Sequence, residues 1–213
     1  MIADPIEHFL VWCARDRGRS VRTIARYRIT LTTAEDACGN LITADIADLE
    51  EWWESRYGHA SATRANELAC LRSFYKWATR FDHRPDDPTR RLDYPKVNIR
   101  QPRPAGKSDL DRLLGELTEN TPDLRRAIAL GALAGLRVSE AAALDWSTID
   151  EEQRLIYVTG KGSKERMVPI SAVLWDLLLP EMAAGNVVTA GGRAYAGDTL
   201  QRRINRLMKA AGI

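Results

Sequence analysis

The sequence predicts a mainly α-helical protein with a small β-hairpin, divided into two domains. Apolar residues recur at helical spacing over most of the 213 residues, and capping residues stand at the start of most of these segments. Near residue 160, two short runs of alternating apolar residues flank a glycine-rich turn, which is the pattern of a β-hairpin. Five of the nine prolines fall within residues 82–106 and keep that stretch extended. We therefore expect a helical domain over residues 1–83, a linker over residues 84–106 and a second domain over residues 107–213.

Four helices are predicted in the first domain. The third, from residue 44 to about residue 57, carries many acids and is expected to face away from any anionic partner. The fourth runs from residue 61 to about residue 81. The residues that cap or begin the four helices are, in order, Asp4 with Pro5, Ser20, Thr43 and Ser61.

Basic residues line up on the second and fourth of these helices. Two on the second helix share a face at i, i+4 spacing, and three on the fourth repeat at i, i+4 and i+8. Six arginines fall within residues 15–28 beside a single acid, whereas a solvated charged face usually mixes both signs. With two residues from the linker, the candidate contacts to an anionic partner are Arg22, Arg26, Arg72, Lys76, Arg80, Arg100 and Arg103.

A tight connection between two helices is the main feature of the second domain. An apolar helix that begins at residue 122 ends at Gly135, because glycine accepts the left-handed backbone common at helix ends. Ser139 is predicted to cap the next helix. Arg137 then lies beside the free amides and positive dipole of that helix, where an anion such as phosphate is held favourably. Glu140, in the first turn, is placed to orient the guanidinium of Arg137.

The remaining elements of the second domain surround that connection. A helix capped by Ser108 precedes it, and the β-hairpin over residues 154–170 follows it, with Lys161 between two glycines at the tip. A nucleotide-binding P-loop is excluded because that motif needs a glycine where this chain has Leu155. Ser171 is expected to cap a short helix, and residues 185–197 are expected to form a loop. A basic amphipathic helix over residues 199–211 comes last.

Composition sets outer limits on the protein class. With 45% hydrophobic and 28% charged residues the chain resembles ordinary globular proteins, and a net charge of +2 is by itself no sign of nucleic-acid binding. Cys13, Cys38 and Cys70 are too widely spaced for a metal motif, so we expect buried thiols and neither zinc nor disulfides. The sequence contains neither a membrane-spanning apolar run nor a signal peptide, which predicts a cytoplasmic protein.

Two motifs together resemble the tyrosine recombinase (phage integrase) family. They are Gly-Leu-Arg-Val-Ser-Glu, starting at Gly135, and Gly-Lys-Gly-Ser-Lys-Glu-Arg-Met-Val-Pro-Ile, starting at Gly160. The resemblance implies a four-helix, SAM-like core-binding domain followed by part of an α+β catalytic domain. It also implies that Arg137 clamps the scissile DNA phosphate, that Glu140 supports the site and that Lys161 protonates the leaving 5′ hydroxyl. A planar fork of donors suits a phosphate whose oxygens gain charge during transfer.

The remaining catalytic residues of that family find no match in this chain. The family carries a His-x-x-Arg box and a nucleophilic tyrosine further along, whereas all three histidines here precede Arg137. No tyrosine sits in a matching context, and the last of them, Tyr195, is interpreted as a loop residue. We therefore expect a 213-residue chain that binds DNA but lacks the nucleophile. The first helix starts so early that no additional arm-binding domain is expected before it.

The resemblance implies site-specific DNA recombination or integration through a 3′ phosphotyrosine intermediate, with neither metal nor nucleotide cofactor. Its implied partners are double-stranded DNA at a recombination core site and other recombinase protomers. The cellular location would be the bacterial host cytoplasm if the protein comes from a phage or mobile element. Two alternatives stay open: a naturally short, non-catalytic DNA-binding protein that occupies recombination sites, and a helical interaction module whose basic stripes are solvated.

Overall fold

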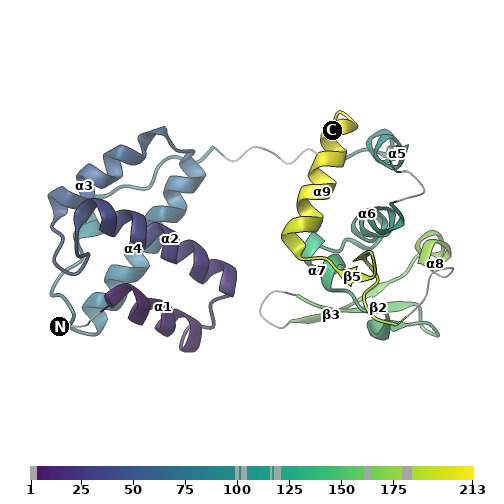
Figure 1. Ribbon diagram of the computed structural model, residues 1–213, viewed down its shortest axis with the longest axis horizontal. Coiled ribbons are helices and arrows are strands. Elements are labelled where there is room, and N and C mark those ends of the chain that lie inside the picture. The colour runs from purple at the N-terminus through teal and green to yellow at the C-terminus, as the bar shows by residue number, and fades with distance from the viewer. Residues whose placement is uncertain are drawn as a thin grey trace. The chain divides into compact units, whose positions relative to one another are not determined.

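The computed structural model describes residues 4–98, 101, 105–115, 117, 121–160, 164–178 and 184–213. The chain divides into a first unit, residues 1–101, and a second unit, residues 102–213, each with its own core (Figure 1). The division falls inside the stretch over which the sequence predicts a linker. The first unit is helical and the second combines helices with small antiparallel sheets, which confirms the predicted fold class.

Two of the predicted helix starts in the first unit are confirmed by their caps. The Asp4 carboxylate accepts the amide of Glu7 at 2.9 Å, and the Ser20 hydroxyl accepts the amide of Thr23 at 3.3 Å. The elements of this unit are α1 (Pro5–Arg15), α2 (Val21–Cys38), α3 (Ile46–Ser55), η1 (Arg56–Gly58), α4 (Ser61–Arg80) and η2 (Pro88–Arg91).

The predicted start of the third helix at Thr43 is wrong. Asp45 caps α3 instead, because Asp45 and Asp48 satisfy each other's free amides in a reciprocal capping box with bonds of 3.0 and 2.9 Å. Thr43 belongs to the preceding turn, where its hydroxyl donates to the Asn40 carbonyl at 3.1 Å. The helix therefore begins at Ile46 and ends at Ser55, and η1 continues the chain.

Aromatic side chains from α1 and α4 fill the centre of the first unit. Phe9 and Phe74 are fully buried and meet edge to face with their ring centroids 5.5 Å apart. Helix α2 packs against α1, α3 and α4 and closes this core. Cys13 and Cys70 are buried, as predicted, and Cys38 is half-buried.

The chain stays with the first unit beyond the end of α4. The Arg84 guanidinium donates to the carbonyls of Leu41 and Ala44 at 3.2 and 3.1 Å, and Thr89 in η2 is fully buried. Leu92 joins the core of the unit. Although the sequence places the linker from residue 84, residues 84–92 are therefore held on the first unit by hydrogen bonds and apolar burial.

The described residues of the second unit form three strands beyond the two of the predicted hairpin: β1 (Ile149–Asp150), β4 (Thr189–Ala190) and β5 (Arg193–Ala194). Strands β4 and β5 pair with each other inside residues 185–197, so the prediction of a plain loop there is wrong. Strands β1, β2 and β3 form an antiparallel sheet in that order, with Val158 opposite Arg166, which confirms the predicted hairpin and adds β1 at its edge. The elements are α5 (Lys107–Gly115), α6 (Pro122–Ala134), α7 (Val138–Ala143), η3 (Trp146–Thr148), β1 (Ile149–Asp150), β2 (Leu155–Thr159), β3 (Glu165–Pro169), α8 (Ala172–Leu178), β4 (Thr189–Ala190), β5 (Arg193–Ala194) and α9 (Gly197–Ala210).

Helix boundaries in the second unit differ from the prediction in two places. Ser108 lies inside the first turn of α5 rather than capping it, because the Asp109 carboxylate accepts the Gly106 amide at 3.0 Å. Helix α9 begins at Gly197, two residues before the predicted start. The hydroxyl of Ser171 does accept the Leu174 amide, at 3.3 Å, and so caps α8 as predicted.

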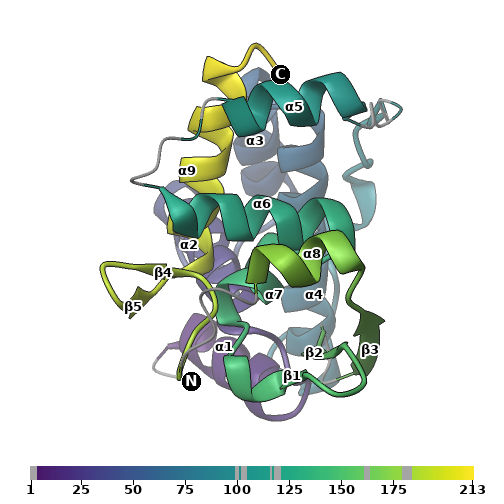
Figure 2. The same cartoon turned by 90° about the vertical axis from the view of Figure 1, so that its right-hand side faces the viewer.

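Helix α6 forms the middle of the second unit. Figure 2 shows α8 lying beside it, and α6 also packs against α7 and α9. Leu130 of α6, Ile156 of β2, Leu174 of α8 and Leu200 of α9 are fully buried in one core. Within the described residues, no helix combines the length and the apolar character that crossing a membrane requires.

Candidate active site

The connection between α6 and α7 presents Arg137 at the surface. Gly135 has a φ of +63° and ends α6 in the left-handed conformation that the sequence predicts. The next residue, Leu136, donates its amide to the Leu130 carbonyl at 3.2 Å and is buried in the core. Because Gly135 and Leu136 are both held in place, the backbone position of Arg137 is fixed. Its side chain extends from that position into solvent and is 69% exposed.

The expected cap of α7 by Ser139 is wrong. The residue at the cap position is Arg137, and the Glu140 carboxylate accepts the Arg137 backbone amide at 2.8 Å. Ser139 lies within the first turn, where the backbone of Gly197 at the start of α9 packs against it. Glu140 thus satisfies a free amide of the helix and places its negative charge at the positive end of the helix dipole.

The carboxylate of Glu140 receives four hydrogen bonds, two at each oxygen. Arg137 donates its backbone amide to Oε2 and its Nη1 to Oε1, each at 2.8 Å. Arg166, from β3, forms a two-pronged pair with the same carboxylate, to Oε1 at 2.9 Å and to Oε2 at 2.8 Å. The Glu140 side chain is only 5% exposed, so this carboxylate is buried but fully paired.

The hydrogen bonds from Arg166 are the main reason why the pKa of Glu140 is lowered. The backbone and side-chain bonds from Arg137 lower it further, while burial acts in the opposite direction, and the pKa falls from 4.5 to about 2. Glu140 is therefore ionised at neutral pH. Two guanidiniums around one carboxylate leave an excess of positive charge, as an anion site requires.

Much of the Arg137 guanidinium remains available to a ligand. Only its Nη1 is bonded to Glu140, and no other acceptor among the described residues bonds to its side chain. Arg166 is less exposed, at 37%, and uses both of its Nη atoms on the carboxylate. Arg137 is thus the group that can bind an oxyanion, and Arg166 holds the carboxylate that orients it.

The hairpin tip begins beside this cluster. The Gly160 amide donates to the Lys164 carbonyl at 2.7 Å across the base of the tip. A side-chain atom on Gly160 would lie 3.6 Å from both the Glu140 carboxylate and the Arg166 guanidinium, so glycine allows the strand to pass close by. The predicted proton donor, Lys161, follows Gly160 directly and lies outside the described residues.

Arg166 belongs to the second sequence motif, but the sequence analysis assigns it no role. The alternation of side chains along the two hairpin strands could have revealed one. Arg166 pairs with Val158, and both therefore project from the face of the sheet on which Ile156 and Val158 are buried. An arginine on a buried face needs an acidic partner, and Glu140 is that partner.

The predicted phosphate contacts of the first unit differ in their surroundings. Arg22, Arg26, Lys76 and Arg80 are exposed. Arg72 is half-buried; its Nη2 donates to the Leu92 carbonyl at 2.6 Å and its guanidinium lies 4.5 Å from the centre of the Tyr94 ring. Arg100 and Arg103 lie outside the described residues.

Of the two tyrosines in the second unit, one has its hydroxyl engaged by another residue and the other projects from the sheet face opposite to Arg166. Tyr195 lies in the loop before α9, is buried, and donates its hydroxyl to Asp123, which also accepts Arg203 at 3.1 Å. Tyr157 pairs with Met167 and so projects from the sheet face opposite to Arg166. In the part of the chain that the structure describes, no group of three or more His, Cys, Asp or Glu side chains is arranged to hold a metal ion.

Comparisons with known proteins match both units. Residues 106–213 match the phage integrase family, and residues 6–81 match the phage integrase N-terminal SAM-like domain. Tyrosine recombinase XerC of Corynebacterium efficiens is 30% identical over 98% of this chain and 72% of its own length. Tyrosine recombinase XerD of Xanthomonas campestris pv. campestris is 35% identical over 78% of this chain, and only 54% of its own length is covered. This chain thus spans about half to three quarters of these relatives.

The solved structure of a lambda integrase (75–356) dimer bound to a COC′ core site shares the fold. Its TM-score is 0.80 at 15% identity, with 98% of this chain and 81% of that chain covered. An integrase of the Tn1549 transposon (residues 82–397), in complex with circular intermediate DNA, has a TM-score of 0.72 at 18% identity, with 97% of this chain and 78% of that chain covered.

Proposed function

Because this chain belongs to the phage integrase family of tyrosine recombinases, we propose that it binds duplex DNA and acts in site-specific recombination. In this proposal the Arg137 cluster holds the scissile phosphate. The observation that carries it is the buried, ionised carboxylate of Glu140, which fixes the backbone and side chain of Arg137 and leaves the rest of that guanidinium exposed. A fixed cation at the surface is suited to hold a phosphate whose oxygens gain negative charge.

The proposed reaction is transfer of a phosphoryl group between oxygens. A tyrosine that these 213 residues do not position loses its hydroxyl proton to solvent, and its oxygen attacks the phosphorus. The bond to the 5′ oxygen breaks, and Lys161 gives a proton to that leaving oxygen. The 3′ phosphotyrosine keeps the energy of the phosphodiester, and a 5′ hydroxyl from a partner strand then reverses the step. Arg137 stabilises charge on the phosphate, and Arg166 acts through Glu140 as a positioning residue.

We further propose that a polypeptide of these 213 residues binds DNA without cleaving it. In the second unit, the Tyr195 hydroxyl is buried and bonded to Asp123, and Tyr157 projects from the sheet face opposite to Arg166. Neither geometry suits attack on a phosphate held by Arg137. A site without a positioned nucleophile has no covalent route, however well its charges are arranged.

The proposed partners are DNA and other protomers of the same kind. Solved relatives of this fold are a lambda integrase dimer bound to a core site and a lambda integrase tetramer bound to a Holliday junction. We propose that this chain likewise acts on DNA together with further protomers, in the cytoplasm.

Two measurements on the same protein test the proposal. Binding to a duplex of mixed sequence is measured as a function of salt, because phosphate contacts set the slope of log affinity against log salt at about 0.9 per phosphate. Arg137→Ala should flatten that slope by about 0.9. Arg125→Ala is the matched control, since Arg125 is also exposed but lies near the opposite end of α6.

The second measurement traps covalent complexes on nicked suicide duplexes with a randomised core. We expect binding without a denaturant-resistant adduct. Failure of the chain to bind DNA at low salt contradicts the proposed function. A denaturant-resistant adduct contradicts the absence of a nucleophile, and Tyr157→Phe and Tyr195→Phe then identify the residue responsible.

A further inference from the structure

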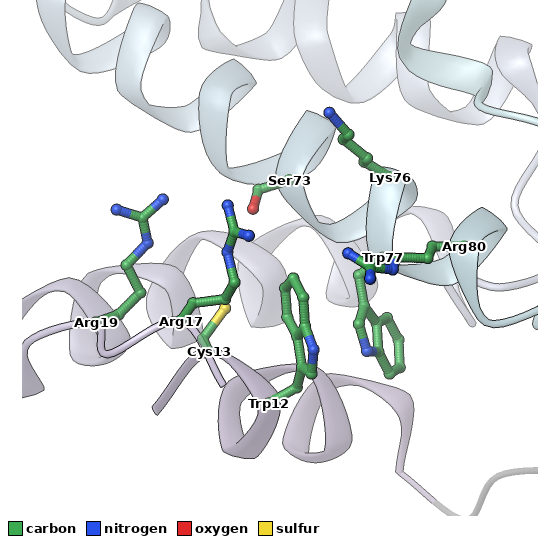
Figure 3. A pocket seen from close by; sticks show the side chains of 8 residues that line it. All are labelled: Trp12, Cys13, Arg17, Arg19, Ser73, Lys76, Trp77 and Arg80. Carbon is green, nitrogen blue, oxygen red and sulfur yellow. The ribbon is translucent and has the colours of Figure 1, made fainter. Parts of the chain in front are cut away.

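A pocket of about 160 Å³ lies in the first unit between α1, the turn that follows it, and α4 (Figure 3). Arg17 and Arg19 reach it from the turn, and Lys76 and Arg80 reach it from successive turns of α4. Four cations from two separate chain segments therefore surround one small volume. The sequence pattern, which follows each helix separately, groups Lys76 and Arg80 with Arg72 instead.

Three other arginines of this unit have acidic partners. Arg28 is paired with Glu7, Arg56 with Glu67, and Arg84 with Asp86. Among the described residues, no carboxylate lines the pocket or forms an ion pair with the four cations. Like charges gathered without a counter-charge repel one another, and a bound anion removes that repulsion.

Aromatic rings support two of the three pocket arginines and leave their hydrogen-bond donors unused. The Arg17 guanidinium lies 5.5 Å from the centre of the Trp12 ring, and that of Arg80 lies 5.7 Å from the Phe81 ring. The turn itself is fixed, since the Arg19 amide donates to the Cys13 carbonyl at 3.0 Å and Gly18 takes a φ of +56°. The pocket is thus partly built before any ligand arrives.

The remaining lining groups are compatible with an anion. Burial raises the pKa of the Cys13 thiol to about 11, although Arg19 and Arg17 act to lower it, so the thiol is neutral at pH 7. Ser73 adds a hydroxyl that can donate to a ligand oxygen. Trp77 is buried and closes one wall.

We propose that this pocket seats one phosphodiester of the DNA backbone, with Arg17, Arg19, Lys76 and Arg80 as its shared cationic contacts. The inference rests on the proposed function and identifies the part of the first unit that meets the backbone. It assigns Arg17 and Arg19 a role that the i, i+4 pattern did not suggest. It also removes Arg72 from the contact set, because the Arg72 guanidinium is engaged by the Leu92 carbonyl and Tyr94.

The test compares salt slopes for the full chain on one duplex of mixed sequence. The variants are Arg17→Gln with Arg19→Gln, Lys76→Ala with Arg80→Ala, and all four changes together. If the four cations share one phosphate, even the fourfold variant flattens the slope by only about 0.9. If each cation contacts its own phosphate, the fourfold variant flattens it by about 3.6.

Arg72→Ala serves as the control on α4, because it removes the same charge outside the pocket, and it should leave the slope unchanged. A thermal unfolding curve for each variant confirms that the exposed cations were removed without loss of fold. An unchanged slope in the fourfold variant, or an additive loss near 3.6, overturns the shared phosphate seat while the proposed function stands. Lack of DNA binding by the unmodified chain overturns the proposed function, and the pocket with it.

Discussion

Replacing Glu140 by glutamine removes the charge at the centre of the Arg137 cluster with little change in shape. In the unmodified chain, the Glu140 carboxylate accepts four hydrogen bonds from two arginines. Glutamine retains one accepting oxygen and turns an NH₂ donor toward the guanidiniums, so the variant loses bonds and gains an unfavourable contact. We expect the second unit to be less stable at pH 7 and the difference from the unmodified chain to depend on pH.

The pH window follows from the lowered pKa of Glu140. In the unfolded chain this group titrates near 4.5, and in the folded chain at about 2, so the folded state is favoured by an ionised Glu140 above pH 4.5. That stability is lost as the pH falls from 4.5 toward 2. The full pKa difference corresponds to about 3 kcal/mol. Since Arg137 and Arg166 reach solvent, screening reduces it, and we expect a loss of about 1–2 kcal/mol between pH 7 and pH 3.

The assay measures the free energy of unfolding in urea at pH 7, 5, 4 and 3. Hydrogen exchange in peptides from residues 149–170 reports on the second unit alone, so unfolding of the first unit does not contribute. The stability gap between the unmodified chain and Glu140→Gln should narrow by about 1–2 kcal/mol across this range. Glu165→Gln is the matched control, because Glu165 is an exposed carboxylate on β3, next to Arg166. The stability difference between this variant and the unmodified chain should stay constant across the same pH range. A Glu140→Gln gap that does not change with pH would refute the ion cluster.

Two further predictions concern the boundary between the units and the buried tyrosine. Trypsin should cut after Lys96 or Arg100 before it cuts after Arg91, because residues 84–92 are held on the first unit, and mass spectrometry of early fragments checks the order. Tyr195→Phe should lower the free energy of unfolding of the second unit by about 1–2 kcal/mol, because the hydrogen bond to Asp123 is lost; urea denaturation measures this, and an unchanged midpoint would show that the bond contributes nothing.

Local patterns were enough to predict the elements that frame the site. Gly135 ends α6 because of its own backbone freedom, and Ser20 and Ser171 cap helices with their own hydroxyls. The alternation of apolar residues around Gly160 likewise predicted the β2–β3 hairpin. In each case the residues that determine the element lie within a few positions of it, so the local sequence is enough to predict it.

Competing local partners and distant contacts explain the remaining differences. Ser139 and Thr43 are reasonable caps, but Glu140 and Asp45 satisfy the free amides better from nearby positions. The pairing of Glu140 with Arg166 joins residues 26 positions apart, which no helix periodicity detects. The hydrogen bond from Arg72 to the carbonyl of Leu92 joins residues 20 positions apart, so the spacing of basic residues along α4 gives no sign of it.

The two units hold their cations by different physical means, and this difference predicts different roles. In the second unit a buried carboxylate fixes Arg137, so some positive charge is cancelled and geometry is gained. In the first unit aromatic rings support Arg17 and Arg80, and the charge around the pocket remains uncompensated. Uncompensated charge contributes mainly to salt-dependent affinity, whereas a fixed guanidinium contributes to positioning of one phosphate. Removal of the pocket cations should therefore weaken binding most at low salt, and loss of Glu140 should misplace the phosphate even where binding persists.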